Sequence, residues 1–489
     1  MRISKSRFIA GCQCVKRLYW QVYQPELSAE SDAATRAIMA QGREVGLLAR
    51  QMFPGGVEVG YEGSLDQAIR TTRELVANRE VPAIFEGVFE HDGVLVRVDV
   101  LHRRRDGRWR LIEVKSSASL KEEHLDDVAI QYRVLSRCGL DLGSCCLAHV
   151  NRNYVFNGGC IDVWRLFKVR NLTRRVERLQ PKLAFQLRSQ FTVLSMPKAP
   201  DIPPGRHCTN PVTCEFYERC NLPRPNDHIG YLPRLHASAA EELEELGVAS
   251  IRDIPDDFEL SEIQRRAATS VQTGKPWFSV ELGELLNELK CPLYFLDFET
   301  ANRATPRFPA MRPYDQLPFQ WSVHFQRAPE AELEHFEFLA TDGSDPRREF
   351  ISSLCAALGE TGNILVYSSF ESQRLSELAS WFPDFADRIG AIQARLFDLL
   401  PVIRVHTYHP AYAGSYSIKS VLPALVPAMT YDGMEVANGQ DAGLAWERLV
   451  HGGLDQREQE RTRTALLDYC WQDTLALVRL LQQLRAQVR

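Results

Sequence analysis

Two carboxylates and a lysine occur on a predicted pair of strands near residue 100. Residues 94–101 (VLVRVDVL) alternate apolar and polar side chains, RRRDGR is a turn sequence, and residues 109–115 (WRLIEVK) form the returning strand. This hairpin presents Asp99, Glu113 and Lys115, and the last two project to one face because they are two residues apart on a strand. Two carboxylates beside a lysine suit a divalent cation that activates water against a phosphodiester. Alone, Glu-x-Lys is more typical of a surface salt bridge.

A second set of carboxylates is spread over residues 293–480. Residues 293–300 (LYFLDFET) predict a buried strand that delivers Asp297 and Glu299 to one face. NILVYSSFESQRLSELA predicts a strand followed by a helix that begins near Glu371. In the predicted C-terminal helix, Tyr469 and Asp473 are four residues apart and share one face. Such a set can hold two divalent cations about 4 Å apart.

Five cysteines near the ends of the first 225 residues have a spacing that suits a metal. Cys208, Cys214 and Cys220 follow a C-x5-C-x5-C pattern in a proline-bearing loop, and Cys12 or Cys14 could supply a fourth ligand. Four thiolates suit either zinc or an iron–sulfur cluster, so spacing alone does not choose the metal. The other seven cysteines lie in apolar sequence surroundings and are expected to be small core side chains. Disulfides are not expected, because the cytoplasm keeps thiols reduced.

These motifs are similar to those of two nuclease families, and the first resemblance covers about residues 1–225. Asp99, Glu-Val-Lys at 113–115 and Gln131 resemble the D…(D/E)XK…Q series of the RecB-type PD-(D/E)XK nucleases. CVKRLYW, which begins at Cys14, and the later cysteines resemble the iron–sulfur branch of that superfamily, which includes the CRISPR-associated RecB-like exonucleases and the AddB-type helicase-nucleases.

The first resemblance implies a set of site residues. A [4Fe-4S] cluster, or alternatively zinc, would be held by four cysteines: Cys14, Cys208, Cys214 and Cys220. Asp99 and Glu113 would hold Mg²⁺ or Mn²⁺, Lys115 would position the attacking water, and Gln131 would orient the strand or the water. The family commonly has a metal-binding His on an early helix where this chain has Glu44, so Glu44 is expected to be a further ligand.

The second resemblance covers about residues 290–485. The placement of Asp297, Glu299, Tyr469 and Asp473 resembles the DnaQ-like, or DEDD-type, 3′ to 5′ exonucleases on the ribonuclease-H-like fold. Glu371 stands where that family has an Asp, and Asp398 is a fallback ligand that more often would be a helix-surface residue. The resemblance implies that four carboxylates bind two ions and that Tyr469 aligns the water, with Lys419 and Tyr416 as candidate substrate contacts.

The length of the chain and the distribution of its charge indicate how these sites are divided between domains. The 489 residues predict a multidomain α/β protein: a PD-(D/E)XK domain with a cysteine-rich segment (1–225), a helical, helix-hairpin-helix-like linker (226–285) and a ribonuclease-H-like domain (286–489). Residues 1–225 carry 34 Lys and Arg against 25 Asp and Glu, whereas residues 226–489 carry 24 against 38. The most basic stretch, residues 151–190, predicts a surface for a polyanion, although a solvated helix face is as good an interpretation.

Together these motifs predict a metal-dependent nuclease. We expect it in the cytoplasm, because no stretch is apolar enough to span a membrane and no signal peptide is recognised. Its partner would be nucleic acid, DNA more than RNA, in a single-stranded or end-exposed form. Two alternatives stay open. One is a nucleic-acid clamp or scaffold in which one or both nuclease folds are inactive, and the other is a zinc-stapled DNA-binding protein without turnover.

Overall fold

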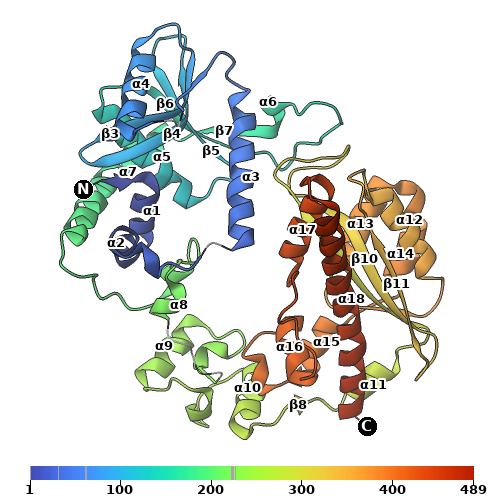
Figure 1. Cartoon of the computed structure of the whole chain (residues 1–489). Coiled ribbons are helices and arrows are strands. Elements are labelled where there is room, and N and C mark those ends of the chain that lie inside the picture. The colour runs from blue at the N-terminus through green and yellow to red at the C-terminus, as the bar shows by residue number, and fades with distance from the viewer. Residues whose placement is uncertain (1, 31, 61–62, 222–224, 226, 489) are drawn as a thin grey trace. The chain divides into compact units, whose positions relative to one another are not determined.

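The chain, described here by a computed structural model for residues 2–30, 32–60, 63–221, 225 and 227–488, has a mixed α/β architecture (Figure 1). It divides into two compact units: the first unit is Met1–Pro223 with Arg303–Asp315, and the second unit is Arg224–Asn302 with Gln316–Arg489. The expected linker, residues 226–285, is grouped with the second unit. Among the described residues, no helix is both long and apolar enough to cross a membrane.

The first unit is built on a seven-stranded sheet in the order β2-β3-β4-β5-β6-β7, with β1 beside β4. Its strands are β1 (Ile3–Ser4), β2 (Val57–Glu58), β3 (Ala83–His91), β4 (Val94–Arg103), β5 (Trp109–Lys115), β6 (Leu142–Val150) and β7 (Phe167–Asn171). Its helices are α1 (Lys5–Gln13), α2 (Val15–Tyr23), α3 (Ala33–Arg50), α4 (Leu65–Ala77), α5 (Glu122–Arg137), α6 (Val163–Leu166), α7 (Thr173–Leu194) and α8 (Tyr217–Cys220).

Alternation along β5 assigns its side chains to two apolar cores. Leu111 packs into the core that β5 shares with α5 and α7, whereas Ile112 packs into the core that it shares with α3. Glu113 and Lys115 have the parity of Leu111, so they lie on the α5 face of the sheet.

The sheet forks at Asp99. The start of β4 pairs in parallel with β1 (Ile3↔Val94), and the end of β4 pairs antiparallel with β5 (Val100↔Ile112). Because β3 pairs along the other edge of β4, β1 and β5 share this edge and Asp99 lies between them. Lys5 directly follows β1 and opens α1, whose N-terminus is capped by Ser4. The fork therefore brings the first residues of the chain to the strand pair that carries Asp99 and Glu113.

The second unit contains a five-stranded sheet in the order β11-β10-β9-β12-β13, and a small pair, β14-β8. Strand β9 runs antiparallel to β10, which runs antiparallel to β11, whereas β12 is parallel to both β9 and β13. The strands are β8 (Trp277–Phe278), β9 (Leu293–Asn302), β10 (Gln316–Gln326), β11 (Leu333–Leu339), β12 (Asn363–Val366), β13 (Leu396–Asp398) and β14 (Thr407–Tyr408). The helices are α9 (Ala237–Glu245), α10 (Glu262–Thr273), α11 (Leu282–Asn287), α12 (Arg347–Ala357), α13 (Phe370–Trp381), α14 (Ala386–Gln393), α15 (Leu399–His406), α16 (Ile418–Leu425), α17 (Gly439–His451) and α18 (Gln456–Gln487).

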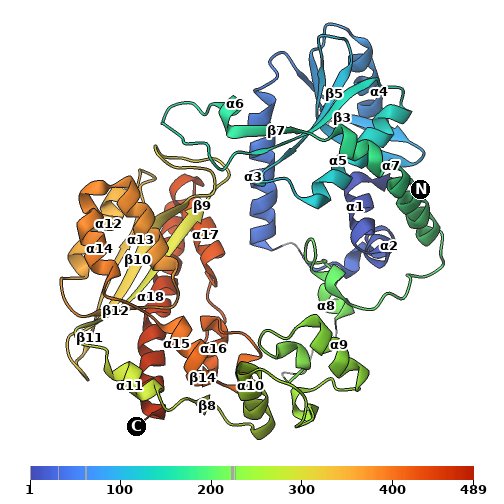
Figure 2. The same ribbon diagram turned by 180° about the vertical axis from the view of Figure 1, so that it is seen from behind.

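Helices cover both faces of the five-stranded sheet (Figures 1 and 2). Tyr294, Leu296 and Phe298 of β9 pack against α12, α13 and α14. Asp297 and Glu299 have the opposite parity, so they face the side where α17 and α18 contact β9. The long helix α18 begins with a capping box at Asp455 and Glu458.

Candidate functional sites

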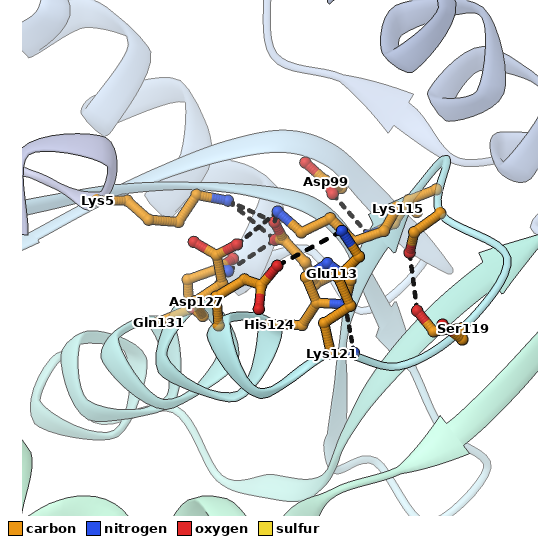
Figure 3. Close-up of polar contacts among 12 residues, drawn as sticks. Lys5, Asp99, Glu113, Lys115, Ser119, Lys121, His124, Asp127 and Gln131 are labelled. Atoms are coloured by element: carbon orange, nitrogen blue, oxygen red, sulfur yellow. Dashed lines mark hydrogen bonds and ion pairs between the residues drawn. The ribbon is translucent and has the colours of Figure 1, made fainter. Parts of the chain in front are cut away.

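The first site lies at the fork of the seven-stranded sheet (Figure 3). Glu113 is buried, and its carboxylate accepts hydrogen bonds from Lys5 Nζ (2.7 and 2.9 Å) and Gln131 Nε2 (2.7 Å). It also forms an ion pair with Lys115 Nζ at 2.9 Å. Lys115 Nζ also lies 2.5 Å from Asp127 Oδ2. The structure thus brings together Glu113, Lys115 and Gln131, and adds two residues that sequence reasoning missed, Lys5 and Asp127.

Asp99 borders this cluster at the point where β4 and β5 separate. Its Oδ2 accepts a hydrogen bond from the backbone N–H of Val114 at 2.7 Å. Burial raises the pKa of Asp99 to about 7, the charge of Glu113 adds to the rise, and Lys5 opposes it. Burial would raise the pKa of Glu113 too, but Lys115 and Lys5 outweigh it and hold that pKa well below its ordinary value. The site therefore contains one firmly ionised carboxylate and one that titrates near neutrality.

Glu44 of α3 has other partners. It forms an ion pair with Arg303 and accepts a hydrogen bond from Thr305 Oγ1 at 3.0 Å. Both partners come from the segment Arg303–Asp315, which follows β9 in sequence but belongs to the first unit. Among the described residues, the ligand atoms of Glu44, Asp99 and Glu113 do not form a group within 4.8 Å of one another.

The four cysteines expected to bind a cluster line one cavity. Cys14, Cys208, Cys214 and Cys220 line it together with Trp20, Phe216 and Tyr217. Backbone N–H groups point at two sulfurs: Gly205 N lies 3.5 Å from Cys208 Sγ, and Phe216 N lies 3.5 Å from Cys214 Sγ. Cys12, the alternative first ligand, lies outside this lining, and its Sγ accepts from Gln190 Nε2 at 3.7 Å. The geometry therefore selects Cys14.

The second site joins residues from three elements of the second unit. Asp297 and Glu299 come from β9, Glu371 from the first turn of α13, and Asp473 from α18. The charges of Asp473, Glu299 and Glu371 all raise the pKa of Asp297, so the four carboxylates interact electrostatically. Ligand atoms of Asp297, Glu299 and Cys470 lie within 4.8 Å of one another. All four acidic residues expected from the sequence are thus brought together.

Burial and like charge make these carboxylates difficult to ionise. Burial, with the charges of its neighbours, raises the pKa of Asp297 and of Glu299 well above the ordinary values. Burial raises the pKa of Glu371 to about 8 and that of Asp473 to about 6. Glu371 Oε2 is buried and has no hydrogen-bond partner among the described residues. A cation would neutralise such a cluster and satisfy this oxygen, so the residues fit a divalent metal site.

Two tyrosines approach the carboxylate of Asp473. Tyr431 donates a hydrogen bond to Asp473 Oδ1 at 2.5 Å, and the Tyr469 hydroxyl also lowers the pKa of that carboxyl by hydrogen bonding. Tyr469 is where the sequence predicts it, whereas Tyr431 and Cys470 were missed. Cys470 could have been predicted near the site, because it directly follows Tyr469 in the sequence. Tyr431 could not, because it lies in a loop without a periodic pattern.

The remaining candidates flank the second site. Lys419 Nζ lies 5.7 Å from the ring centre of Tyr431, and its charge acts on the pKa of Glu299 and of Asp473. The backbone carbonyl of Tyr416 accepts a hydrogen bond from the Tyr367 hydroxyl at 2.9 Å. Asp398 is not a helix-surface residue: it ends β13, caps α15 through Leu400 N at 2.9 Å, and raises the pKa of nearby Glu371.

Helix α7 carries part of the basic stretch 151–190. One side of α7 is buried through Val176, Leu183 and Leu187. The other side has residues at three- and four-residue intervals, which share a face: Arg174, Arg178, Lys182, Phe185 and Arg188. Phe185 is 66% exposed, and Trp164 of α6 is 67% exposed. We call the five α7 residues the α7 stripe.

One family model matches a range that lies mostly in the second unit. Residues 294–417 match the family described as "Domain of unknown function (DUF2779)", and this range includes Asp297, Glu299 and Glu371. No curated protein matches the chain. A solved structure titled "Crystal structure of SSO0001" is similar at 14% identity over 38% of this chain and 75% of that chain, with a TM-score of 0.19. A TM-score this low does not establish a shared fold.

Proposed function

We propose that the protein is a metal-dependent nuclease that hydrolyses phosphodiester bonds of single-stranded or end-exposed DNA, acting as a 3′ to 5′ exonuclease at its second site. The observation that carries this proposal is the convergence of four carboxylates, three of them buried (Glu299, Glu371 and Asp473) and one half-buried (Asp297). Placing buried acidic groups beside one another is costly unless cations bind among them. A five-stranded mixed sheet whose first strand delivers two of the carboxylates is compatible with the ribonuclease-H-like fold.

In this proposal the side chains of the second site have separate roles. Divalent cations, held by the four carboxylates, would supply an activated water and stabilise the departing oxygen. The Tyr469 hydroxyl, held at Asp473, would orient the water for in-line attack. Lys419 would add positive charge for the substrate phosphate, because its ammonium group already acts on Glu299 and Asp473.

The first site is the second candidate for hydrolysis. Glu113, Lys115 and Gln131 meet on one face of the sheet, and Asp99 borders them at the fork, as in the D…(D/E)XK…Q series. By that resemblance, Asp99 and Glu113 are the pair that would hold Mg²⁺ or Mn²⁺ and Lys115 is the residue that would stabilise charge on the phosphate, provided that the site admits a divalent cation. The proposal for this unit is a RecB-like PD-(D/E)XK domain.

A [4Fe-4S] cluster is the proposed ligand of the cysteine cavity. Four thiolates suit either zinc or an iron–sulfur cluster. The resemblance of CVKRLYW and the later cysteines to the iron–sulfur branch supports the cluster. The N–H groups aimed at Cys208 and Cys214 are typical of thiolate ligands. Absorbance near 400 nm in anaerobically purified protein, lost in Cys208→Ser, tests this assignment.

The nuclease proposal is tested by cleavage of labelled polymers. Wild type, Lys115→Ala and Asp297→Ala are incubated with 5′-labelled single-stranded DNA or RNA in Mg²⁺, Mn²⁺ or EDTA, and the products are resolved on a gel. We expect metal-dependent shortening by wild type that Asp297→Ala abolishes. Binding without cleavage in every metal would instead favour the clamp, the alternative function that the α7 stripe also fits.

A further inference from the structure

The first site already contains a cation that the D…(D/E)XK…Q series does not include. Lys5 Nζ lies 2.7 Å from Glu113 Oε1 and 2.9 Å from Glu113 Oε2, so it binds both oxygens of the carboxylate (Figure 3). The Lys5 side chain is 21% exposed and that of Glu113 is 2% exposed. This ion pair is therefore shielded from solvent and weakly screened by salt.

The oxygens of Glu113 have no acceptor capacity left. An ionised carboxylate has about four lone-pair sites. Oε1 accepts from Lys5 and forms an ion pair with Lys115, and Oε2 accepts from Lys5 and Gln131, so each oxygen already has two cationic or hydrogen-bond partners. A divalent cation would need at least one of these sites. Lys115 and Gln131 belong to the expected machinery, so Lys5 is the donor that a cation would have to displace.

Lys5 is held in place by its surroundings on both sides. It follows β1, which pairs with β4, and it opens α1, whose first turn is capped by Ser4. Further along α1, the Phe8 carbonyl accepts from the buried Gln190 side chain at 3.0 Å. Displacing the ammonium group would leave a buried carboxylate with fewer partners or would move the start of the chain.

We propose that Lys5 is the resident cation of the first site, occupying the position of a divalent ion at Glu113, so that the first unit takes up no Mg²⁺ or Mn²⁺ and does not hydrolyse phosphodiesters. Glu44, the expected third ligand, is consistent with this, because its carboxylate already forms an ion pair with Arg303 and accepts a hydrogen bond from Thr305. The proposal rests on the assignment of Asp99 and Glu113 as the metal-binding pair of the proposed function. Hydrolysis then depends on the second site alone.

The test counts bound Mn²⁺ in the full chain by electron paramagnetic resonance of the free ion. We expect wild type and Glu113→Gln to bind the same number of ions, because Glu113 holds none. Lys5→Met should bind about one more ion per chain, and the double variant Lys5→Met/Glu113→Gln should lose it again. Lys198→Met, which removes an exposed lysine elsewhere in the first unit, is the matched control and should match wild type.

The outcomes separate this proposal from the nuclease proposal. If wild type binds one more ion than Glu113→Gln, the first site takes up metal and the role of Lys5 is wrong; this comparison does not depend on the folding of Lys5→Met. If a folded Lys5→Met gains no ion, Lys5 does not exclude the metal, and the proposal is equally overturned. The second site is assessed independently, by the Mn²⁺ and the cleavage that Asp297→Ala removes.

Discussion

At the scale of single residues, two tyrosine hydroxyl groups lower the pKa of Asp473 in the second site. Burial raises its pKa to about 6, and hydrogen bonds from Tyr431 and Tyr469 oppose the rise. A donor that stabilises the carboxylate lowers its pKa, so removing either donor should raise the pKa further. The two tyrosines differ in role, however, because only Tyr469 is expected to orient water.

We therefore predict different kinetic effects for Tyr431→Phe and Tyr469→Phe. Both should shift the acid limb of the pH–rate profile to higher pH. Tyr469→Phe should also lower the plateau rate by about 10²-fold or more, the usual loss when a positioned proton-handling group is removed. The measurement is the rate of shortening of labelled single-stranded DNA in Mn²⁺ across pH. Equal plateau rates for the two variants would contradict the role assigned to Tyr469.

The raised pKa values of the second site also predict how stability depends on pH. A carboxyl group that titrates near 4 when unfolded, and near 6 (Asp473) or 8 (Glu371) when folded, holds its proton more tightly in the folded state. Its contribution to stability is complete below about pH 4 and is lost as the pH rises through the folded pKa. For Asp473 alone this corresponds to about 3 kcal/mol, and the coupled groups do not simply add.

The metal-free protein should accordingly unfold at a lower temperature at about pH 8 than at about pH 5. Mn²⁺ or Mg²⁺ should raise the unfolding temperature, and more at the higher pH, because ionised carboxylates bind the cations. Thermal unfolding followed by circular dichroism checks both effects. Glu371→Gln should weaken the pH dependence, whereas Glu435→Gln, at an exposed ion pair, is the control.

At the scale of secondary-structure elements, sequence periodicity predicted the strands that carry the chemistry. The predicted hairpin at 94–101 and 109–115 corresponds to β4 and β5, and the strand at 293–300 lies within β9. Alternation determines which face a strand residue occupies, and that was enough to place Glu113 with Lys115 and Asp297 with Glu299. Helical spacing likewise placed Tyr469 with Asp473.

Contacts between elements distant in sequence could not be predicted in this way. Lys5 reaches Glu113 because β1 pairs with the first two residues of β4, and a pairing this short has no periodic signal. Glu44 is bound by Arg303 and Thr305 because a segment that follows β9 belongs to the first unit. Tyr431 is placed by a loop. In each case tertiary packing, not local pattern, determines the partner.

Helix α1 connects the two sites of the first unit, since Lys5 opens it and Cys14 is its C-terminal cap. Gly11 permits close packing with α7: a Cβ atom at Gly11 would lie 2.5 Å from Cδ of the buried Gln190. We predict that Gly11→Val destabilises the protein by about 1–3 kcal/mol, the typical cost of overpacking, and lowers the content of bound iron. Gly42→Val, on α3 where an added Cβ meets nothing within 4 Å, should have little effect.

Urea unfolding and iron content, measured on both glycine variants, check this prediction. A loss of stability in Gly11→Val with full iron content would show that the position of α1 and the cysteine cavity are not coupled. Similar behaviour of Gly11→Val and Gly42→Val would show that the contact between α1 and α7 is easily accommodated.

At the scale of the whole molecule, charge is divided between the halves of the chain. The first 225 residues have an excess of Lys and Arg, and the remainder has an excess of Asp and Glu. An acidic surface repels phosphate until cations neutralise it, so in EDTA the affinity for nucleic acid should come mainly from the first unit. The α7 stripe combines four basic residues with the exposed ring of Phe185, a combination that suits backbone contacts and base stacking.

This division predicts two separable defects in binding of labelled single-stranded DNA, measured by fluorescence anisotropy in EDTA at several salt concentrations. Arg174→Ala/Arg178→Ala should weaken binding and reduce the slope of log K against log salt by about 1.4, because each lost phosphate contact on a single strand contributes about 0.7. Phe185→Ala should weaken binding by about 1–3 kcal/mol without changing the slope, since stacking releases no counterions. Arg348→Ala/Arg388→Ala removes two exposed basic residues of the second unit and should leave both quantities unchanged. Equal effects of the two arginine pairs would mean that the stripe is an ordinary solvated helix face and that the polyanion binds elsewhere.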